Sequence, residues 1–514
     1  MRLDHATCYR ALQARDARFD GRFFTAVRTT GIYCRPICPA RTPKAENCVF
    51  YPSAAAAQEA GFRPCLRCRP ESSPDLGAWR GTSATVSRAL SLIEGGALDR
   101  EGAGALAERL GLGERQLRRL FKLHLGASPV AVAQTRRVLL AKQLLHETGL
   151  SMTDVALASG FGSIRRFNET FLQLYGRPPK ELRRRRGHGP DGSAITLMLP
   201  YRPPYDWDGL IGFLASRAIP GVENVSAGEY RRTIVLAGAS GTIAVTHDPE
   251  RCALQATIRF PKLGALPSII ARIRRIFDLS ADPAAIGAQL SRDPRLARLV
   301  AARPGLRVPG AWDGFEIAVR AVLGQQITVA AATRLAGRLA RVFGETLEEP
   351  DPAGLSHLFP TPERLLDADI ASLGMPRARG SAINGLAAAA LADPRLFDPR
   401  GNLPDAVERL RALPGIGEWT AQYIAMRGLR ETDALPAGDI GLLRALADGE
   451  GRRPSPADLL AQAEAWRPWR AYAALHLWAA DPGAPAAATT MTRTDHAPDH
   501  RPARHPDGAH PARL

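Results

Sequence analysis

The sequence lacks two features that would direct a protein to a membrane or out of the cell. It contains no uninterrupted apolar run of eighteen or more residues, the length that a membrane-spanning helix needs. Residues 1–21 carry charges throughout and include no apolar stretch of the kind found in secretory signals. These absences predict a cytoplasmic, nucleoid-associated protein with no membrane partner.

Acidic residues are too few to balance the basic ones. The chain has 51 Asp and Glu against 68 Lys and Arg, a formal net charge of +17. An excess of this size attracts polyanions, most commonly nucleic acid. A high-GC composition rich in Ala, Arg, Gly and Pro would also raise the charge. The charge alone is therefore about equally consistent with nucleic-acid binding and with a high-GC composition that has no bearing on the partner.

Cysteines are few, but five of the seven lie between Cys34 and Cys68. Disulfides do not persist in the cytosol, so such a cluster indicates a metal or reactive site. Cys34-x3-Cys38 is followed after 26 residues by Cys65-x2-Cys68, two close pairs that can supply a tetrahedral zinc site. Spacing alone favours a purely structural zinc module. Cys48 lies outside the ligand pattern, and we expect a buried free thiol.

The residues around these cysteines are more informative than their spacing. FDGRFFTAVRTTGIYCRPICPART (19–42) and ENCVFYPSAAAAQEAGFRPCLRCRPE (46–71) closely resemble the N-terminal domain of the Ada-type adaptive-response proteins. The resemblance implies that Cys34, Cys38, Cys65 and Cys68 bind one Zn²⁺. It also implies that Cys34, the first cysteine of the Cys-Arg-Pro-x-Cys motif, irreversibly accepts a methyl group from DNA methylphosphotriesters. Zinc keeps a thiol ionised at neutral pH, and the thiolate is the nucleophile.

Two stretches in the next region have the layout of helix–turn–helix units. Residues 104–125 and 153–175 each read as a short Ala-rich helix, a glycine turn and a second helix. The pair resembles the AraC-type DNA-binding domain, which implies that the second helices enter adjacent major grooves. Any single arginine is more often on a solvated face or in contact with a phosphate than a reader of bases. The residues expected to bind DNA are Arg115, Arg118, Arg119, Ser163, Arg165, Arg166 and Asn168.

The C-terminal half carries the string Leu413-Pro-Gly-Ile-Gly417 between two helical patterns. This is a helix–hairpin–helix, in which Leu413, Gly415 and Gly417 let backbone amides approach a DNA phosphate. By itself the hairpin indicates only nonspecific DNA binding. Asp439 follows Trp419 by twenty residues. A carboxylate there can cap a helix, and it can also stabilise positive charge on a sugar as a glycosidic bond breaks.

From Thr196 to about Ala480 the chain resembles the 3-methyladenine DNA glycosylase II family. The shared strings are PPYDW, GFLASRAI, ARPGLRVPG, FPTPERL, LGMP, LPGIGEWTAQYIAMRG and WRPWRAYAALHLW. The resemblance implies that Asp439 is the catalytic carboxylate and that Trp419, Tyr423 and Trp478 form the base pocket. Aromatic walls suit 3-methyladenine and 7-methylguanine, because both are cationic bases that a glycosylase flips out of the duplex.

The chain also lacks two features found elsewhere in the glycosylase superfamily. Bifunctional lyases carry a lysine just after the hairpin, where this chain has Trp419, so we expect a monofunctional enzyme. Another family member has a leucine wedge where this chain has Gln326. Glutamine can still fill the gap left by a flipped base, and Gln326 is therefore grouped with the pocket.

These patterns together predict a multidomain α+β protein with four folded regions and a tail. Strands are expected near 195–199, 233–236, 242–246 and 253–260, followed by a helix from about Gly264 to Phe277. The expected domains are a small zinc-binding α/β domain (1–78), an all-α double helix–turn–helix domain (80–187), an antiparallel sheet with helices (194–280), an all-α helix–hairpin–helix domain (281–482) and a disordered tail (483–514).

Two functional hypotheses remain at this stage. One is a repair enzyme with both reactions, in which methylation strengthens sequence-specific binding and activates transcription. The other is a transcriptional regulator whose repair modules act only as a sensor and a DNA clamp. O6-methylguanine transfer is excluded because no Pro-Cys-His-Arg motif occurs. The expected partners are alkylated double-stranded DNA and promoter double-stranded DNA, and RNA polymerase is a further candidate. The chain is expected to be a monomer.

Overall fold

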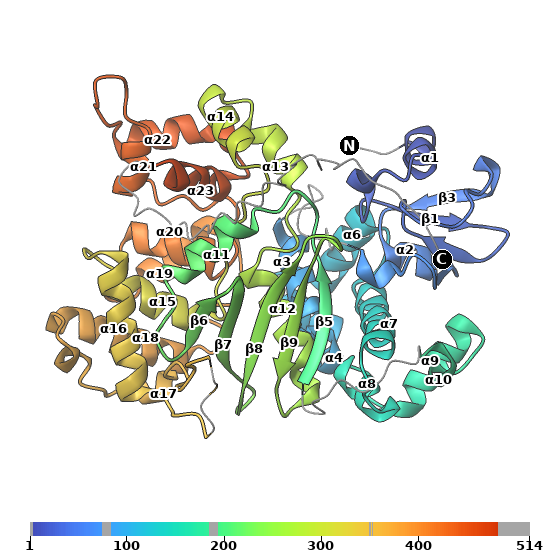
Figure 1. The fold of residues 1–514 in the computed structure, drawn as a ribbon, viewed down its shortest axis with the longest axis horizontal. Helices are drawn as coiled ribbons and strands as arrows, with labels where there is room; N and C mark the ends of the chain where they lie inside the picture. The colour runs from blue at the N-terminus through green and yellow to red at the C-terminus, as the bar shows by residue number, and fades with distance from the viewer. Residues whose placement is uncertain (1–3, 74–83, 184–193, 349–350, 352, 482–514) are drawn as a thin grey trace, which may run out of the picture.

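The computed structural model describes residues 4–73, 84–183, 194–348, 351 and 353–481. Figure 1 shows a five-stranded sheet near the middle of the molecule. The cysteine-rich region and the helix–turn–helix region lie on one side of it, and the C-terminal helices lie on the other. The predicted linker at 187–193 and the predicted disordered tail lie outside the described residues. None of the helices in the described ranges is long and apolar enough to cross a membrane.

The cysteine-rich region is built on a four-stranded sheet in the order β3-β1-β2-β4. Its strands are β1 (Phe24–Val27), β2 (Ile32–Cys34), β3 (Cys48–Tyr51) and β4 (Arg63–Pro64). Helices α1 (His5–Gln13) and α2 (Ala54–Glu59) flank the sheet, and Asp4 and Ser53 cap their N-termini. Sequence patterns did not predict these helices, because nine and six residues are too short to show a clear helical period.

The second region is all helical, as predicted. Its helices are α3 (Ala84–Glu94), α4 (Ala97–Arg100), α5 (Ala103–Arg109), α6 (Glu114–Leu125), α7 (Pro129–Glu147), α8 (Met152–Ala158), α9 (Ile164–Tyr175) and α10 (Pro179–Leu182). The pairs α5–α6 and α8–α9 are the two helix–turn–helix units, and the 19-residue helix α7 joins them. Each second helix buries aromatic or leucine side chains four residues apart, on the face opposite its basic residues.

The third region contains the five-stranded antiparallel sheet, in the order β5-β9-β8-β7-β6. Four of its strands were predicted: β5 (Ala194–Pro200), β7 (Glu229–Leu236), β8 (Ala239–Asp248) and β9 (Ala253–Arg259). The edge strand β6 (Glu223–Ser226) was missed, because its four residues include a single aliphatic one. Helices α11 (Trp207–Ala215) and α12 (Leu266–Ile276) accompany the sheet, and α12 matches the predicted helix.

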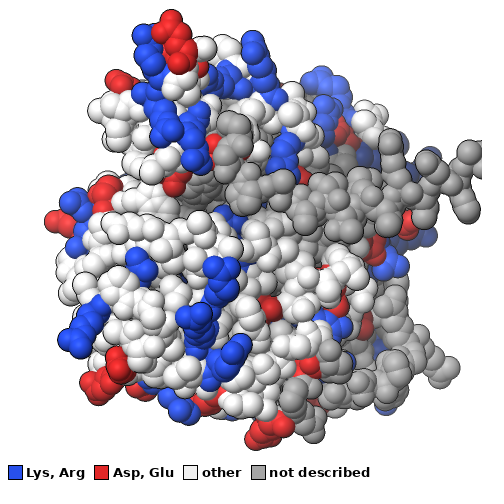
Figure 2. Space-filling model, turned by 60° about the vertical axis from the view of Figure 1, so that its left-hand side comes forward, with Lys and Arg blue, Asp and Glu red and all other residues white. Residues whose placement is uncertain are grey.

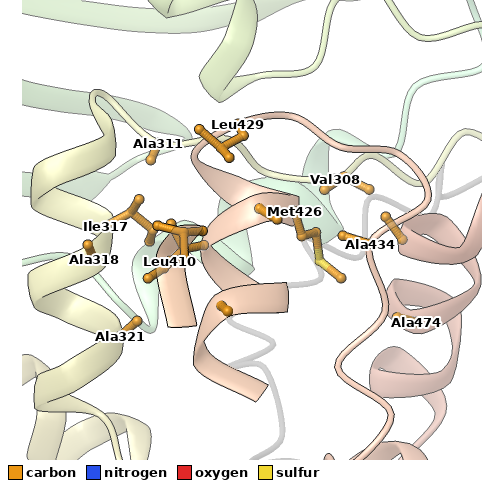
Figure 3. Packing of buried hydrophobic residues seen from close by; sticks show 14 of the residues in the cluster. Val308, Ala311, Ile317, Ala318, Ala321, Leu410, Met426, Leu429, Ala434 and Ala474 are labelled. Carbon is orange, nitrogen blue, oxygen red and sulfur yellow. The ribbon is translucent and has the colours of Figure 1, made fainter. Parts of the chain in front are cut away.

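The C-terminal region is helical throughout. Its helices are α13 (Pro283–Leu290), α14 (Pro294–Ala302), α15 (Gly314–Leu323), α16 (Val329–Phe343), α17 (Pro362–Leu365), α18 (Arg377–Ala392), α19 (Leu403–Arg411), α20 (Glu418–Arg427), α21 (Ile440–Ala445), α22 (Pro456–Ala463) and α23 (Arg470–Ala480). One hydrophobic cluster runs through them. Figure 3 shows Ile317 of α15, Leu410 of α19 and Met426 of α20 meeting in it, with Ala474 of α23 beyond. This packing holds the hairpin helices in place.

One hydrophobic core is shared by two of the regions. A single buried cluster contains Leu144 of α7, Phe171 of α9, Leu197 of β5 and Ile269 of α12. It therefore joins the second helix–turn–helix unit to the five-stranded sheet.

Candidate metal centre and base pocket

The parallel pairing of β2 with β4 brings the two cysteine pairs together. Tyr33 lies opposite Pro64 in this ladder, so Cys34 and Cys65 leave adjacent strand ends. The thiol sulfurs of Cys34, Cys38, Cys65 and Cys68 all lie within 4.8 Å of one another. A tetrahedral zinc site with Zn–S bonds of about 2.3 Å places its sulfurs about 3.8 Å apart. The four thiols therefore form one tetrathiolate zinc site.

The four ligands differ in how accessible they are. Cys38, Cys65 and Cys68 are buried, whereas Cys34 is only half-buried. The amide of Arg35 donates to the sulfur of Cys68 at 3.3 Å, and that of Arg67 donates to Cys65 at 3.3 Å. Among the described residues, no backbone amide donates to the sulfur of Cys34. A hydrogen bond draws electron density from a thiolate, so the sulfur of Cys34 keeps more electron density than the sulfurs of Cys65 and Cys68.

Arg35 fixes the loop between the first two ligands. Its guanidinium donates to the carboxylate of Asp20 at 2.9 Å, to the hydroxyl of Ser72 at 2.8 Å and to the carbonyl of Cys68 at 3.2 Å. The side chain thus joins the first cysteine pair to the second. Cys48 is buried, as expected, and its thiol lies 3.4 Å from the carbonyl of Lys44.

The predicted hairpin lies between α19 and α20. Gly415 has a φ of +77°, and a Cβ at this position would lie 2.6 Å from that of Ala382 in α18, so both the backbone angle and the packing require glycine. Gly417 is exposed and begins α20 without a side-chain cap. Leu413 is half-buried against the core. The amides that begin α20 are therefore open to an anion such as a DNA phosphate.

Asp439 is held by three donors. The indole nitrogen of Trp478 donates to its Oδ1 at 2.8 Å, and that of Trp419 donates to its Oδ2 at 2.9 Å. The amide of Leu442 also donates to Oδ1, at 3.0 Å, so Asp439 is the N-cap of α21. A Cβ at Gly441 would lie 3.0 Å from Oδ1, so this position must stay small. These contacts fix the orientation of the Asp439 carboxylate.

The three predicted pocket aromatics lie together beside this carboxylate. The rings of Trp419 and Tyr423 stack at 5.2 Å with an interplanar angle of 8°, and Trp478 meets Tyr423 edge-on at 6.5 Å. The phenol of Tyr423 accepts a hydrogen bond from Arg427 at 2.7 Å. Burial alone would raise the pKa of Tyr423, but the guanidinium groups of Arg427 and Arg217 outweigh it and lower the pKa.

Sequence reasoning did not single out Arg427 or Arg217. Arg427 is buried and also donates to the carbonyls of Pro309 and Gly310, at 2.8 and 3.0 Å. Arg217 lies 3.8 Å above the ring of Phe213. Both residues fall inside strings quoted for the glycosylase resemblance. Arg427 follows Tyr423 by four positions on α20, so helical spacing could have placed it beside the ring, whereas no local pattern brings Arg217 there.

Gln326 lies in the turn between α15 and α16. It has a φ of +58°, which is uncommon for a residue other than glycine. Its neighbour Gln325 ties the turn to the hairpin by donating to the carbonyl of Gly415 at 2.9 Å. The turn therefore lies next to the hairpin. Figure 2 shows basic side chains distributed over the side of the molecule that is on the left in Figure 1.

The residues predicted to bind DNA lie on the exposed faces of α6 and α9: Arg115, Arg118 and Arg119 on the first helix, and Arg165, Arg166 and Asn168 on the second. Ser163 is the N-cap of α9, accepting from the amide of Arg166 at 3.2 Å. Arg118 pairs with Glu114, and Arg165 pairs with Glu169. The other arginines on these faces are thus more available for DNA.

Comparisons with known proteins place each region in a family. Residues 7–71 match the metal-binding domain of Ada, 106–185 a helix–turn–helix domain, 196–313 the AlkA N-terminal domain and 319–471 the HhH-GPD superfamily of base-excision DNA repair proteins. The chain is 44% identical over 481 residues to a probable bifunctional transcriptional activator/DNA repair enzyme AlkA of Mycobacterium tuberculosis, covering 92% of this chain and 96% of that one.

Two further relatives match separate halves. DNA-3-methyladenine glycosylase 2 of Escherichia coli is 38% identical over 284 residues, which are 54% of this chain and 95% of the relative. The bifunctional transcriptional activator/DNA repair enzyme Ada of the same organism is 34% identical over 200 residues, which are 38% of this chain and 54% of the relative.

Proposed function

Because the chain belongs to the family of bifunctional transcriptional activator/DNA repair enzymes of the AlkA type, we propose that it repairs alkylated DNA by two separate reactions. One is hydrolysis of the N-glycosidic bond of alkylated bases at Asp439. The other is irreversible methyl transfer from DNA methylphosphotriesters to Cys34. The observation that carries the first reaction is the pair of indole donors that hold the Asp439 carboxylate beside an aromatic stack.

In the first reaction, a base flipped from the duplex stacks against Trp419, Tyr423 and Trp478. A cationic base such as 3-methyladenine or 7-methylguanine is attracted to these rings, and it leaves as a neutral molecule when it takes the electron pair of the glycosidic bond. Asp439 stabilises the positive charge that develops on the sugar, and water supplies the new hydroxyl. No lysine stands at Trp419, which supports a monofunctional enzyme that leaves the strand intact.

The hairpin and the Gln326 turn serve this reaction by holding the duplex. The open amides at Gly415 and Gly417 bind a phosphate, and Gln326 fills the space that the flipped base leaves. The neighbouring Gln325–Gly415 hydrogen bond supports this assignment, because it keeps the two elements in register on one surface.

In the second reaction, the sulfur of Cys34 attacks the methyl carbon of a phosphotriester. The S–C bond forms as the C–O bond breaks, and the oxygen keeps the electron pair as part of an anionic phosphodiester. Zinc supplies the ionised state of the thiol at neutral pH. Cys34 is more exposed than its three buried partners, and no amide among the described residues donates to its sulfur. Both observations support this residue as the acceptor.

Methylation would also change how the domain binds DNA. A tetrathiolate zinc site carries a charge of about −2, and methylating one sulfur removes one negative charge. At about 6 Å from a phosphate, with an effective dielectric constant near 20, this favours binding by roughly 2–3 kcal/mol. The helix–turn–helix units then bind promoter DNA more tightly and activate transcription. We further propose that the chain acts as a monomer and contacts RNA polymerase when bound.

One experiment tests both reactions. The full chain is incubated with methylated duplex DNA, and released bases and protein mass are followed together. We expect free 3-methyladenine and a mass gain of one methyl group. Asp439→Asn should lower base release by about two to three orders of magnitude while methyl uptake continues. Cys34→Ala should abolish uptake and leave base release unchanged.

Two matched variants serve as controls. Asp448→Asn changes an exposed loop carboxylate of the same region, and Cys48→Ser changes a thiol outside the ligand set. If base release survives in Asp439→Asn, or methyl uptake survives in Cys34→Ala, the role assigned to the substituted residue is refuted. If the wild-type chain itself makes neither product, the regulator whose repair modules only sense and clamp DNA is favoured instead.

A further inference from the structure

A lysine from the DNA-binding region is buried directly behind the second cysteine pair. Lys142, on α7, has no exposed side-chain surface. Its ammonium donates to the carbonyl of Cys65 at 2.9 Å and to the carboxylate of Glu71 at 2.8 Å. An ammonium is costly to bury unless it is paired and hydrogen-bonded, so these contacts account for its presence here.

The partners of Lys142 are themselves held by α7. The carboxylate of Glu71 lies 3.1 Å from Arg69 and 3.7 Å from the ring of His146, one turn along the helix. Arg69 pairs with Glu147, at the end of α7, at 2.7 Å. Cys65 and the segment after Cys68 are therefore both attached to the same face of α7.

The two cysteine pairs are thus supported in different ways. Arg35 and Asp20, which belong to the cysteine-rich region itself, hold the loop of the first pair. A helix of the next region holds the carbonyl of Cys65 in the second pair. Because the carbonyl of Cys65 is fixed in this way, the backbone of Cys65, and with it the direction of its side chain, is restricted.

We propose that Lys142 is a positioning residue of the metal centre, so that two regions of the chain build the zinc site. Lys142 touches neither the metal nor the DNA, and it acts through the backbone of Cys65. The proposal needs only the zinc site. Its relevance to methyl transfer rests on the function proposed above. Residues that orient metal ligands commonly change metal affinity by about 10–100-fold when they are removed.

The chain offers a matched comparison. Lys122 on α6 pairs with Glu59 of the cysteine-rich region at 2.8 Å, so it joins the same two regions by the same chemistry. Its side chain is 65% exposed, however, and its ion pair lies outside the ligand loop. Exposed ion pairs contribute little to stability. Lys142→Met and Lys122→Met therefore separate positioning of the ligands from simple contact between the regions.

The test is zinc affinity of the full-length chain, measured by competition with a chelator in the absence of DNA. We expect Lys142→Met to bind zinc about tenfold more weakly or worse, and Lys122→Met to stay within about twofold of the wild type. Hydrogen exchange at residues 65–73 of the zinc-loaded chain should rise in the first variant only. An unchanged zinc affinity in Lys142→Met would overturn the proposal.

A double variant guards against loss of the fold. Glu71→Gln with Lys142→Met removes both members of the buried ion pair, so it avoids the buried carboxylate that the single variant leaves without its ammonium partner. We expect it to keep the circular dichroism of the wild type and still bind zinc several-fold more weakly, because Cys65 remains without its donor. Wild-type affinity in this folded variant would also refute the proposal. A wild-type chain that accepts no methyl group would refute only the methyl transfer.

Discussion

The metal centre and the base pocket hold their reactive groups by different means. Cys34 is placed by a strand end and three neighbouring sulfurs, all within a single stretch from Cys34 to Cys68. Asp439 is placed by the side chains of Trp419 and Trp478, which come from helices twenty residues before it and 39 after it. The ligands of the first site are thus local in sequence, whereas the orientation of the carboxylate in the second site depends on long-range packing.

Among the changes considered, removal of one of the indole donors to Asp439 should have the largest effect, and this effect should be confined to the base pocket. Trp478→Phe keeps an aromatic ring in the pocket but removes the hydrogen bond to Oδ1 of Asp439. Hydrogen bonds to charged groups contribute about 1.5–3 kcal/mol, so kcat for base release should fall roughly tenfold to a hundredfold. Single-turnover assays with methylated DNA measure this, and methyl uptake should not change.

Trp312→Phe is the matched control for that substitution. Trp312 is buried, and its indole nitrogen has no hydrogen-bond partner among the described residues. The change therefore reduces the ring that Arg232 and Arg272 contact, but it removes no donated hydrogen bond. An equal loss of kcat in both variants would mean that packing, and not the donated hydrogen bond, makes Trp478 important.

Acid should weaken the pocket through a neighbouring histidine. Burial lowers the pKa of His476, on α23 with Trp478, to about 4. Between the unfolded value near 6.5 and this value, the unfolded chain binds more protons, so stability falls as the pH falls through this window. The contribution is up to about 3 kcal/mol. Denaturant unfolding from about pH 7 to 4 measures it.

His476→Gln should reduce this pH dependence, because the amide does not titrate. If the variant loses stability with falling pH as steeply as the wild type, other groups cause the loss. The zinc thiolates are the same in both proteins, so a difference in the pH dependence of stability between them arises from His476 and not from the thiolates.

The smallest effect is expected far from both sites. Arg166→Ala on α9 removes one exposed charge, so it should weaken binding to unmodified duplex DNA a few-fold and lower the slope of log affinity against log salt by about 1. Fluorescence anisotropy at several salt concentrations measures this. Base release and methyl uptake at saturating DNA should remain as in the wild type. A changed rate of either reaction would mean that the helix–turn–helix takes part in the chemistry.

The sequence predicted much of this molecule, because many of its elements depend on patterns within a few neighbouring residues. The cysteine spacing, the two helix–turn–helix units, four strands of the central sheet and the hairpin were all visible as patterns a few residues long. The same locality allowed Asp439 to be predicted as an N-cap. Short elements such as α2 and β6 were not predicted, because they contain too few residues to show a helical or strand period.

What the sequence could not predict depends on contacts between distant segments. Lys142 reads as an ordinary helical lysine, yet it is buried against Cys65, 77 positions away. Arg217 lies beside Tyr423 although it is 206 positions earlier in the chain, whereas Arg427 lies four positions after Tyr423 on the same helix. Local sequence patterns do not predict the long-range contacts of Lys142 and Arg217. Resemblance to known families supplied the pocket residues, but it did not supply the side chains that hold them.

The hydrophobic cluster shared by α7, α9 and the five-stranded sheet has a consequence for how the chain can be divided. Cutting it between residues 183 and 194 would leave Leu144 and Phe171 on one fragment and Leu197 on the other, each facing water. Gln143 and Glu147 would also lose the backbone of Met198, to which they bond at 2.8 and 3.1 Å. The regulator half and the glycosylase half would then be expected to aggregate when expressed apart and to associate when expressed together.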